Sequence, residues 1–432
     1  MKSVWLSATV ASALLAVGLT ACGTGSSGGS ASGSLQIWEG YTGAESHAFA
    51  HLLGEWNKAH PNVKVTSLFV NNDSSLPKLL TAVKGGSQPD IAYVYGSWAP
   101  NIAEIPQVVN LTKVVQRPGV DWNDFWTGER DVATVNGRVI GIPALVDNLA
   151  VVYNKTLFAQ AGLQPPSPDW TWSDFVADAA RLTNPAKKQY GTAYVTPGSE
   201  DTVWHWEALL WEAGGQILNS SNTKAAFDSP AGLEALNTLR TMAITDKSMY
   251  LDPSDSEYAN VFNSGKIGML VTGPWDLSAF PNVKYGVQIM PSFPGINSHQ
   301  TISGPDNWVI FNNGSQRVAE AEQFLLWLTA TPQATYFSLA TGDLPIRQSV
   351  QQSPGFLQKM DSALPGVDTF VTNLGNVQQA RPQLPTYPKV STILGSMIVS
   401  VLLGKSQPQA ALDSAAQQVD AALATGSAGS GS

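Results

Sequence analysis

The sequence predicts an α/β protein of two domains, in which parallel strands are joined by crossover helices. The chain has 432 residues, more than one compact core usually holds. Hydrophobic residues make up 43% and charged residues 13%, which is the composition of a folded chain. Short apolar runs alternate with amphipathic segments of about ten residues or more, a pattern typical of parallel sheets with crossover helices.

The predicted strands are short and bounded by turn residues. The first is followed by a turn-like segment with Gly40 and Gly43, and the second follows Pro61 and Asn62. We expect strands at 35–38, 63–65, 90–94, 141–143, 149–153, 267–271, 285–289 and 308–311.

The predicted helices repeat apolar residues every three to four positions. In the first, Phe49, Leu52 and Trp56 share one face, and Pro61 ends the helix. The segment 392–403 is apolar but only about a dozen residues long, too short for a membrane span. We expect helices at 44–60, 76–83, 171–182, 203–213, 231–244, 318–329, 392–403 and 408–423.

The first 34 residues form an export signal and a tether. Lys2 precedes an uncharged apolar run from Val4 to Leu19, and the sequence Leu-Thr-Ala-Cys ends at Cys22. That ending resembles the lipobox of bacterial lipoproteins, which implies a lipid anchor on Cys22. An ordinary cleaved signal in which Cys22 is incidental is the alternative. Residues 23–34 are only Gly, Ser, Thr and Ala, typical of a flexible linker.

Composition and motifs exclude several function classes. The net charge is −9, and no Lys/Arg run exceeds the pair Lys187 and Lys188, so we expect no nucleic-acid partner. One cysteine excludes an internal disulfide. No phosphate loop or GxSxG nucleophile elbow occurs. His47 and His51 have a metal-ligand spacing, but solvent-exposed helix histidines are the favoured interpretation, so no metal and no cofactor are expected.

Several short motifs follow one another along the chain. They are 35–41 (LQIWEGY), 55–65 (EWNKAHPNVKV), 86–91 (GSQPDI), 141–143 with 151–155 (GIP and VVYNK), 262–269 with 273–275 (FNSGKIGM and GPW), and 344–347 (LPIR). Each is weakly specific alone. Collinear over about 35–425, they resemble the extracellular solute-binding proteins of ABC importers, in the family that includes maltose-binding protein.

The resemblance implies a periplasmic-binding-protein-like fold of two α/β lobes with several inter-lobe crossovers and a ligand cleft between the lobes. It implies a membrane-tethered receptor, not an enzyme, which hands its solute to ABC permease subunits at the outer face of the cytoplasmic membrane. We expect a monomer. The expected segments are a signal peptide 1–21, a tether 22–34, a first lobe 35–146 plus about 300–345, a second lobe 147–299 plus 346–425, and a flexible tail 426–432.

Aromatic rings and polar groups after the predicted strands are the candidate ligand-binding residues. The chain has 14 tryptophans, and flat apolar faces suit the C–H faces of sugar rings, while carboxylates and amides pair with hydroxyls. Trp275 lies where the family commonly places a stacking ring. The candidates are Glu39, Tyr41, Tyr95, Ser97, Trp98, Asp147, Asn148, Trp204, Trp206, Glu207, Trp275, Asp306, Asn307 and Arg347.

The expected ligand is a carbohydrate, either an oligosaccharide or a related polyhydroxyl compound. One departure from the family pattern is the loop after the third strand, where Tyr95, Ser97 and Trp98 stand in place of an acidic residue. That departure leaves open a polyol or a glycerophosphodiester, with Arg347 on the phosphate. A surface glycosidase would need two facing carboxylates, and a sugar sensor without transport is a third alternative.

Overall fold

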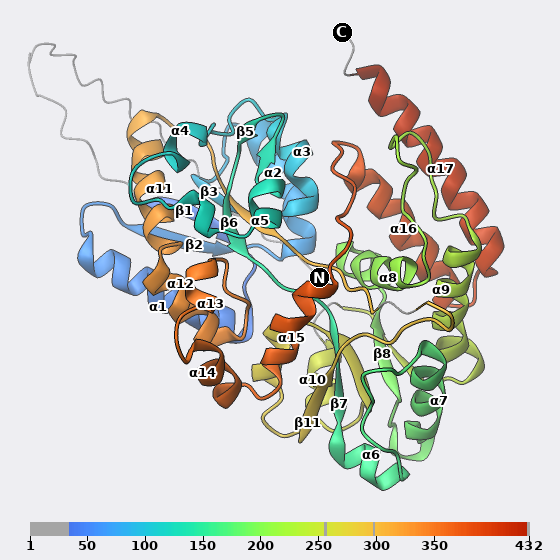
Figure 1. Ribbon diagram of the computed structural model, residues 1–432. Coiled ribbons are helices and arrows are strands. Elements are labelled where there is room, and N and C mark those ends of the chain that lie inside the picture. Colours follow the sequence, from blue (N-terminus) through green and yellow to red (C-terminus); the bar gives the residue numbers. More distant parts are fainter. Residues whose placement is uncertain (1–33, 255–256, 297–298, 430–432) are drawn as a thin grey trace, which may run out of the picture. The chain divides into compact units, whose positions relative to one another are not determined.

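Two β-sheets, each packed against helices, organise the chain (Figure 1). The computed structural model describes residues 34–254, 257–296 and 299–429. Cys22, the predicted signal peptide and the tether up to residue 33 lie outside the described residues. The described residues from Ser34 onward belong to one compact unit.

The first sheet has the strand order β2-β1-β3-β12-β6. Strands β1, β2 and β3 pair in parallel as predicted, but β12 is antiparallel to both β3 and β6. The all-parallel expectation is therefore wrong here, because the chain enters β12 from the second sheet instead of through a crossover helix. The strands are β1 (Leu35–Glu39), β2 (Val65–Phe69), β3 (Ile91–Tyr95), β6 (Ile142–Leu145) and β12 (Asp306–Ile310).

The second sheet has the order β10-β7-β11 and is antiparallel throughout, which again differs from the expected parallel arrangement. A separate parallel pair, β8-β9, lies in the same half of the chain, and a two-residue hairpin, β4-β5, belongs to the first half. These strands are β4 (Thr134–Val135), β5 (Arg138–Val139), β7 (Ala150–Asn154), β8 (Thr192–Val195), β9 (Met249–Asp252), β10 (Met269–Thr272) and β11 (Tyr285–Gln288).

We call the first sheet with its helices the first lobe. All five of its strands come from 35–146 and 300–345, the segments expected for that lobe. Helix α1 starts with a capping interaction in which the Thr42 N–H donates to Glu45 Oε2 at 3.4 Å. The helices are α1 (Gly43–Ala59), α2 (Asn72–Lys84), α3 (Ala99–Ala103), α4 (Thr112–Val115), α5 (Thr127–Val132), α11 (Ser315–Leu328) and α12 (Thr331–Thr341).

The second lobe contains the second sheet, the β8-β9 pair and helices that include α8 and α16. Its helix α8 is buried along nearly its whole circumference, and α16 packs against both α8 and α17. Helices α13 and α14 contact α12 of the first lobe. The helices after β7 other than α11 and α12 are α6 (Lys155–Ala161), α7 (Trp172–Leu182), α8 (Glu200–Glu212), α9 (Pro230–Arg240), α10 (Glu257–Asn263), α13 (Gln348–Gln351), α14 (Phe356–Ala363), α15 (Val367–Asn373), α16 (Tyr387–Leu402) and α17 (Pro408–Gly429).

Helix α17 runs to Gly429, so it extends into the segment expected as the tail from residue 426. The expected helix 231–244 ends in one π-helical turn, Thr241–Thr245. The described residues include no helix long and apolar enough to cross a membrane.

Three segments connect the lobes and pair with one another. Val146 bridges Leu344, and Asn148 bridges Ser303, each in antiparallel fashion. The segments are those between β6 and β7, between β11 and β12, and between α12 and α13. The first crossover segment therefore pairs with each of the other two.

Candidate functional site

A cavity of about 490 Å³ lies between the two lobes. In the first lobe it lies at the carboxyl ends of β1, β2, β3 and β6, and at the start of the antiparallel β12, so all five strands meet it at the same edge of the sheet. Ligands of open α/β sheets bind at that edge. Its volume is within the range of about 300–1,000 Å³ usual for small-molecule sites.

The first-lobe wall is a hydrogen-bonded set of tyrosines and carboxylates. Asp306 accepts hydrogen bonds from the Tyr93 hydroxyl at 2.5 Å and from the Gly96 N–H at 3.0 Å. The Tyr95 hydroxyl donates to Asp73 Oδ1 at 3.1 Å. Gly96 has to be glycine, because a Cβ there would lie 1.9 Å from the Pro305 carbonyl oxygen. The wall is thus fixed before any ligand binds.

The second-lobe wall is aromatic. Trp204 on α8 and Trp275, just after β10, have ring centroids 5.8 Å apart with planes inclined by 37°, and Tyr258 on α10 lines the same wall. A Cβ at Gly273 would lie 1.7 Å from the Trp275 ring, so glycine is what lets that ring fold back over the end of β10. Such rings offer flat apolar faces with a polar edge.

Two carboxylates of this wall have basic partners. Arg381 Nη1 donates to Glu200 Oε1 at 2.9 Å, and Glu200 also accepts from the hydroxyls of Ser97 and Ser391. Asp201 pairs with His205 at 3.2 Å. Arg381, the one Lys or Arg among the described lining residues, is therefore already bound to a carboxylate.

Asp147 comes from the first crossover. Its Oδ1 accepts the Gly304 N–H at 2.9 Å, and a Cβ on Gly304 would lie 2.4 Å from that oxygen. Its Oδ2 has no hydrogen-bond partner among the described residues, although only 8% of the residue is exposed. A buried carboxylate oxygen facing a cavity is suited to accept a hydrogen bond from a ligand.

Burial dominates the electrostatics of the cavity. It raises the pKa of Asp306 to about 6, with the nearby Glu200 adding to the rise and Arg381 opposing it. Burial, with the negative charge of Asp306, also raises the pKa of Asp147 well above its usual value. In all, six carboxylates line the cavity: Glu45, Asp73, Asp147, Glu200, Asp201 and Asp306.

Five of the residues predicted from sequence line this cavity, namely Tyr95, Asp147, Trp204, Trp275 and Asp306. The other nine do not. Sequence reasoning missed Tyr93, Asp73, Glu200, Tyr258 and Arg381. Asp73 was missed because β2 ends four residues later than expected, so the turn after it was not examined. Glu200 was missed because α8 starts three residues earlier, at the Ser199 cap.

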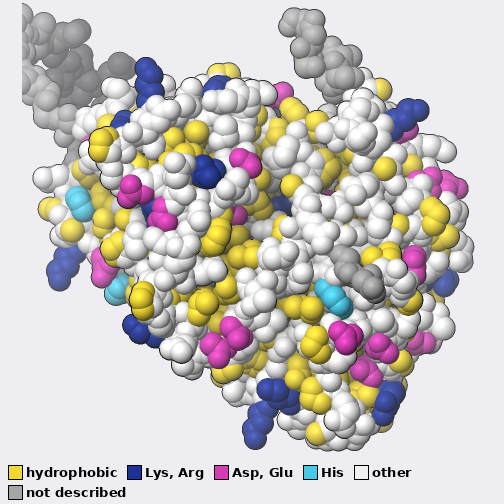
Figure 2. Space-filling model, viewed as in Figure 1, with side chains coloured by type: hydrophobic (Ala, Val, Ile, Leu, Met, Phe, Trp, Pro, Cys, Tyr) yellow, Lys and Arg dark blue, Asp and Glu magenta, His cyan; other side chains and the backbone are white. Residues whose placement is uncertain are grey.

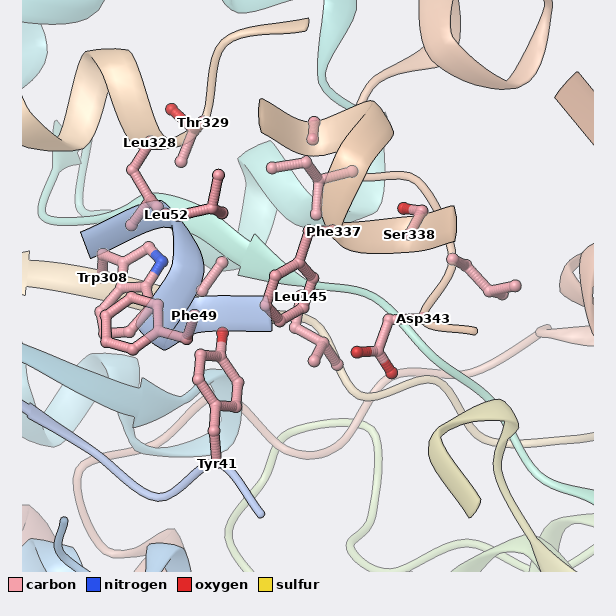
Figure 3. A pocket seen from close by; sticks show the side chains of 14 residues that line it. Tyr41, Phe49, Leu52, Leu145, Trp308, Leu328, Thr329, Phe337, Ser338 and Asp343 are labelled. Carbon is pink, nitrogen blue, oxygen red and sulfur yellow. The ribbon is translucent and has the colours of Figure 1, made fainter. Parts of the chain in front are cut away.

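Tyr41 and Glu39 belong to the packing of the first lobe. Tyr41 lies edge-on to Phe49 at 5.4 Å and to Trp308 at 5.9 Å, beside a separate small pocket (Figure 3). Glu39 Oε2 accepts the Tyr41 N–H at 2.8 Å. Asp343, at the edge of the same pocket, is buried, and burial raises its pKa to about 7.

Arg347 is not brought to the cavity. It lies under the first lobe, where its Nε donates to the Thr329 carbonyl at 2.6 Å, its Nη1 contacts Asp124 at 3.3 Å, and its guanidinium lies 4.1 Å from the centre of the Phe125 ring. With these donors in use and only 4% of the residue exposed, it does not line the cavity where a phosphate would bind. We therefore assign it a structural role.

The remaining candidates are buried in structural positions. Trp98 belongs to the first-lobe core, and Trp206 and Glu207 to the second-lobe core around α8. Asn148 donates to the Phe370 carbonyl at 2.8 Å, and Asn307 is a buried residue of β12 because that strand starts earlier than predicted. Ser97 holds Glu200 and faces the opposite side of the crossovers.

Basic side chains do not gather into a large patch on the face drawn in Figure 2. Among the described residues, no group of three or more His, Cys, Asp or Glu side chains has a metal-binding arrangement. His51 contacts Glu55 at 3.3 Å on the exposed face of α1.

Known proteins resemble this chain over nearly its full length. The sn-glycerol-3-phosphate-binding periplasmic protein of Pectobacterium atrosepticum is 23% identical over 426 residues, covering 92% of this chain and 93% of that protein. The cyclic alpha-maltosyl-1,6-maltose binding protein of Arthrobacter globiformis is 28% identical with a TM-score of 0.73, over 91% of this chain and 99% of that one.

A third likeness concerns the fold alone. UgpB of Mycobacterium tuberculosis, solved with glycerophosphocholine, is 20% identical with a TM-score of 0.81, over 91% of this chain and 99% of that one. The family model of bacterial extracellular solute-binding proteins matches residues 40–335. With the two-lobed α/β fold and the cavity between its lobes, this match means that the chain belongs to the bacterial extracellular solute-binding protein family.

Proposed function

We propose that this chain captures a carbohydrate, an oligosaccharide or a related polyhydroxyl compound, in the cavity between its lobes and delivers it to the permease of an ABC importer. The observation that supports this proposal is that an aromatic wall and a carboxylate wall line the same cavity. Trp204 and Trp275 offer ring faces, and Asp147, Asp306 and Asp73 offer acceptors across from them. Sugar rings need both, because their C–H faces are apolar and their hydroxyls donate.

Charge favours a carbohydrate over a glycerophosphodiester. The phosphate group of a glycerophosphodiester offers only acceptors and carries one negative charge, whereas the cavity itself presents six carboxylates. Arg381 is bound to Glu200, and Arg347 is used under the first lobe. A phosphate would therefore have to displace a carboxylate from Arg381, at the cost of leaving Glu200 buried without its cation. UgpB of Mycobacterium tuberculosis, which was solved with glycerophosphocholine, keeps this ligand class in the test.

The family is one of binding proteins, and we expect no chemical turnover. In this proposal the functional event is closure of the lobes around the ligand, a hinge-type population shift. We propose that Cys22 carries a lipid that holds the monomeric receptor at the outer face of the membrane, and that the boundaries expected from sequence delimit the two lobes.

A thermal-melting panel on the purified mature chain tests the ligand class. The panel holds mono- and disaccharides, maltodextrins, polyols and glycerophosphodiesters. A ligand at 100 times its Kd adds about 2.7 kcal/mol to the free energy of unfolding, which raises Tm by several degrees. We expect a rise with a carbohydrate and none with a glycerophosphodiester. A rise with the phosphodiester alone contradicts the carbohydrate assignment, and chemical loss of the sugar over hours contradicts the expectation of no turnover.

A further inference from the structure

A second cavity, of about 550 Å³, lies on the opposite face of the crossover segments. Along the first crossover, Leu145 and Asp147 line the cavity described above, whereas Val146 between them lines the second cavity. Neighbouring residues of an extended chain point to opposite faces. We call this second space the back cavity.

The second crossover shows the same alternation. Gly304 and Asp306 line the carbohydrate cavity, while Ser303 and Pro305 line the back cavity. Two crossovers with the same alternation place the two cavities back to back. Arg381 is the one described residue that lines both.

The walls of the back cavity are largely apolar and come from both lobes. The Trp126 ring is held in place because its Nε1 donates to the Pro345 carbonyl at 2.8 Å. The other apolar lining side chains are Val132, Val146, Pro305, Val371, Leu374, Val377 and Ala380. A cavity of this size with a few polar groups is the usual form of a small-molecule site.

Glu129 is a buried polar residue of this cavity whose carboxyl group has no partner among the described residues. It lies on α5, only 3% of it is exposed, and its side chain makes no hydrogen bond or ion pair within the described part of the chain. Gln351 Oε1, which also lines the cavity, likewise has no partner there. A buried acceptor without a donor costs about 1–3 kcal/mol, so a donor from outside the chain would be stabilising.

The charges around Glu129 make the position favourable for a cation. Burial first, and then the negative charges of Asp306 and Asp147 across the crossovers, raise its pKa well above the usual value. Arg381 also lines the cavity, but its guanidinium is bound to Glu200. The carboxyl of Glu129 therefore lacks a counter-charge as well as a donor.

We propose that the back cavity is a second small-molecule site, which binds a primary ammonium ion carried on an aromatic or aliphatic body. The ammonium has three donors and no acceptor, which matches the unpaired oxygens of Glu129 and Gln351. The body packs against Trp126, Val371 and Leu374. An alcohol of the same shape lacks the charge, so it gains only the apolar contacts.

Titration calorimetry on the purified mature chain with 2-phenylethylamine as probe tests this site, with 2-phenylethanol as the uncharged match. We expect saturable amine binding at least tenfold tighter than alcohol binding. Glu129→Gln should weaken amine binding at least tenfold and leave alcohol binding unchanged. Asp131→Asn, two residues away on α5 and exposed, should leave both unchanged.

If Glu129→Gln does not fold, a second variant tests the same site. Leu374→Trp keeps the carboxyl but fills the cavity, and it should abolish binding of both probes. Equal affinity for amine and alcohol, no loss in Glu129→Gln, or unchanged binding in Leu374→Trp would each overturn the ammonium site. A carbohydrate that binds normally while the amine does not would leave the proposed function intact.

Discussion

Trp204 and Trp275 reach one wall of the cavity from two different elements, with their ring centroids 5.8 Å apart and their planes inclined by 37°. Trp204 comes from the first turns of α8, and Trp275 from the turn after β10. The rings are inclined rather than coplanar, so a sugar ring stacked on one of them would meet the edge of the other. The pair therefore defines an angled surface rather than a single stacking platform.

Replacing one of these rings should weaken ligand binding without unfolding the protein. Trp275 is half-buried, and Trp275→Ala should cost about 1–3 kcal/mol of binding free energy, the loss expected for an aromatic hot spot. Titration calorimetry with the ligand from the thermal panel measures it. An affinity unchanged within error would assign Trp275 to packing alone.

Trp204 and Trp206 form a matched pair on one helix. Trp204 lines the cavity, whereas Trp206 is fully buried against Phe227 in the second-lobe core. Trp204→Phe should therefore lower affinity with a small change in Tm, and Trp206→Phe should lower Tm with little change in affinity. The opposite pattern would place the ligand away from this wall.

Asp147 should contribute to ligand affinity through Oδ2, the carboxylate oxygen that has no partner among the described residues. Asp147→Asn keeps the size of the side chain and leaves an oxygen to accept the Gly304 N–H, but it puts an amide donor where the ligand hydroxyl donates. We expect a loss of about tenfold in affinity, since hydrogen bonds to charged groups contribute about 1.5–3 kcal/mol. The Tm of the ligand-free protein should rise or stay the same, because the variant removes a buried charge. Equal affinity in the two proteins would contradict a contact between Asp147 and the ligand.

The sequence predicted the elements better than their pairing. Apolar periodicity placed α1, α7 and α16 because each has a buried face, and α7 begins one residue after the predicted start, with Thr171 as its N-cap. Strand direction was wrong for β12, β10 and β11, since local periodicity does not report whether the next strand is reached through a helix or from another lobe. That depends on long-range topology.

The site was predicted in part for a related reason. Trp275 and Asp147 follow strands that end close to the predicted positions, and Trp204 lies on a helix that the sequence predicted apart from its first turn. Trp206 is the same residue type as Trp204, and Arg347 was a candidate for a phosphate, but both side chains are used in contacts within the fold. Residue type alone does not distinguish a ligand-binding side chain from a structural one. Arg381 lies between α15 and α16, in a segment without periodicity, and only the fold brings it beside Glu200.

Arg347 should affect stability and not affinity. Besides Thr329 and Asp124, its guanidinium donates to the Val120 carbonyl at 3.2 Å, a geometry that the point charge of lysine does not reproduce. Arg347→Lys should lower the free energy of unfolding by about 2–4 kcal/mol. Denaturant titration and calorimetry measure both quantities. A loss of affinity at unchanged stability would restore the predicted ligand role.

Acylation of Cys22 should determine whether the protein remains with the membrane. If it is acylated, Cys22→Ala should release the protein from the membrane fraction, and mass spectrometry of the wild-type N-terminus should show a lipid-modified cysteine. The matched control is Ser27→Ala in the tether, which should remain with the membrane. A wild-type protein already free of the membrane would favour an ordinary cleaved signal.

Glu207 should make stability fall as the pH rises. It is fully buried, its Oε1 accepts the Tyr387 hydroxyl at 2.7 Å, and its Oε2 has no partner among the described residues. Burial first, and then the negative charge of Glu200, raise its pKa to about 8 from a usual value of 4.5. Between these two values the folded protein holds a proton that the unfolded chain has lost, so the free energy of unfolding decreases with rising pH.

Glu207→Gln removes this contribution because the amide does not titrate and still accepts the Tyr387 hydrogen bond. The slope of unfolding free energy against pH should become shallower by up to about 1.4 kcal/mol per pH unit between pH 5 and 8, which is the contribution of one proton. The variant should equal the wild type near pH 4.5 and exceed it at pH 8. Denaturant titrations at four pH values measure this, with Glu234→Gln, exposed on α9, as control. Parallel slopes in wild type and Glu207→Gln would mean that Glu207 is already ionised in the folded protein at neutral pH.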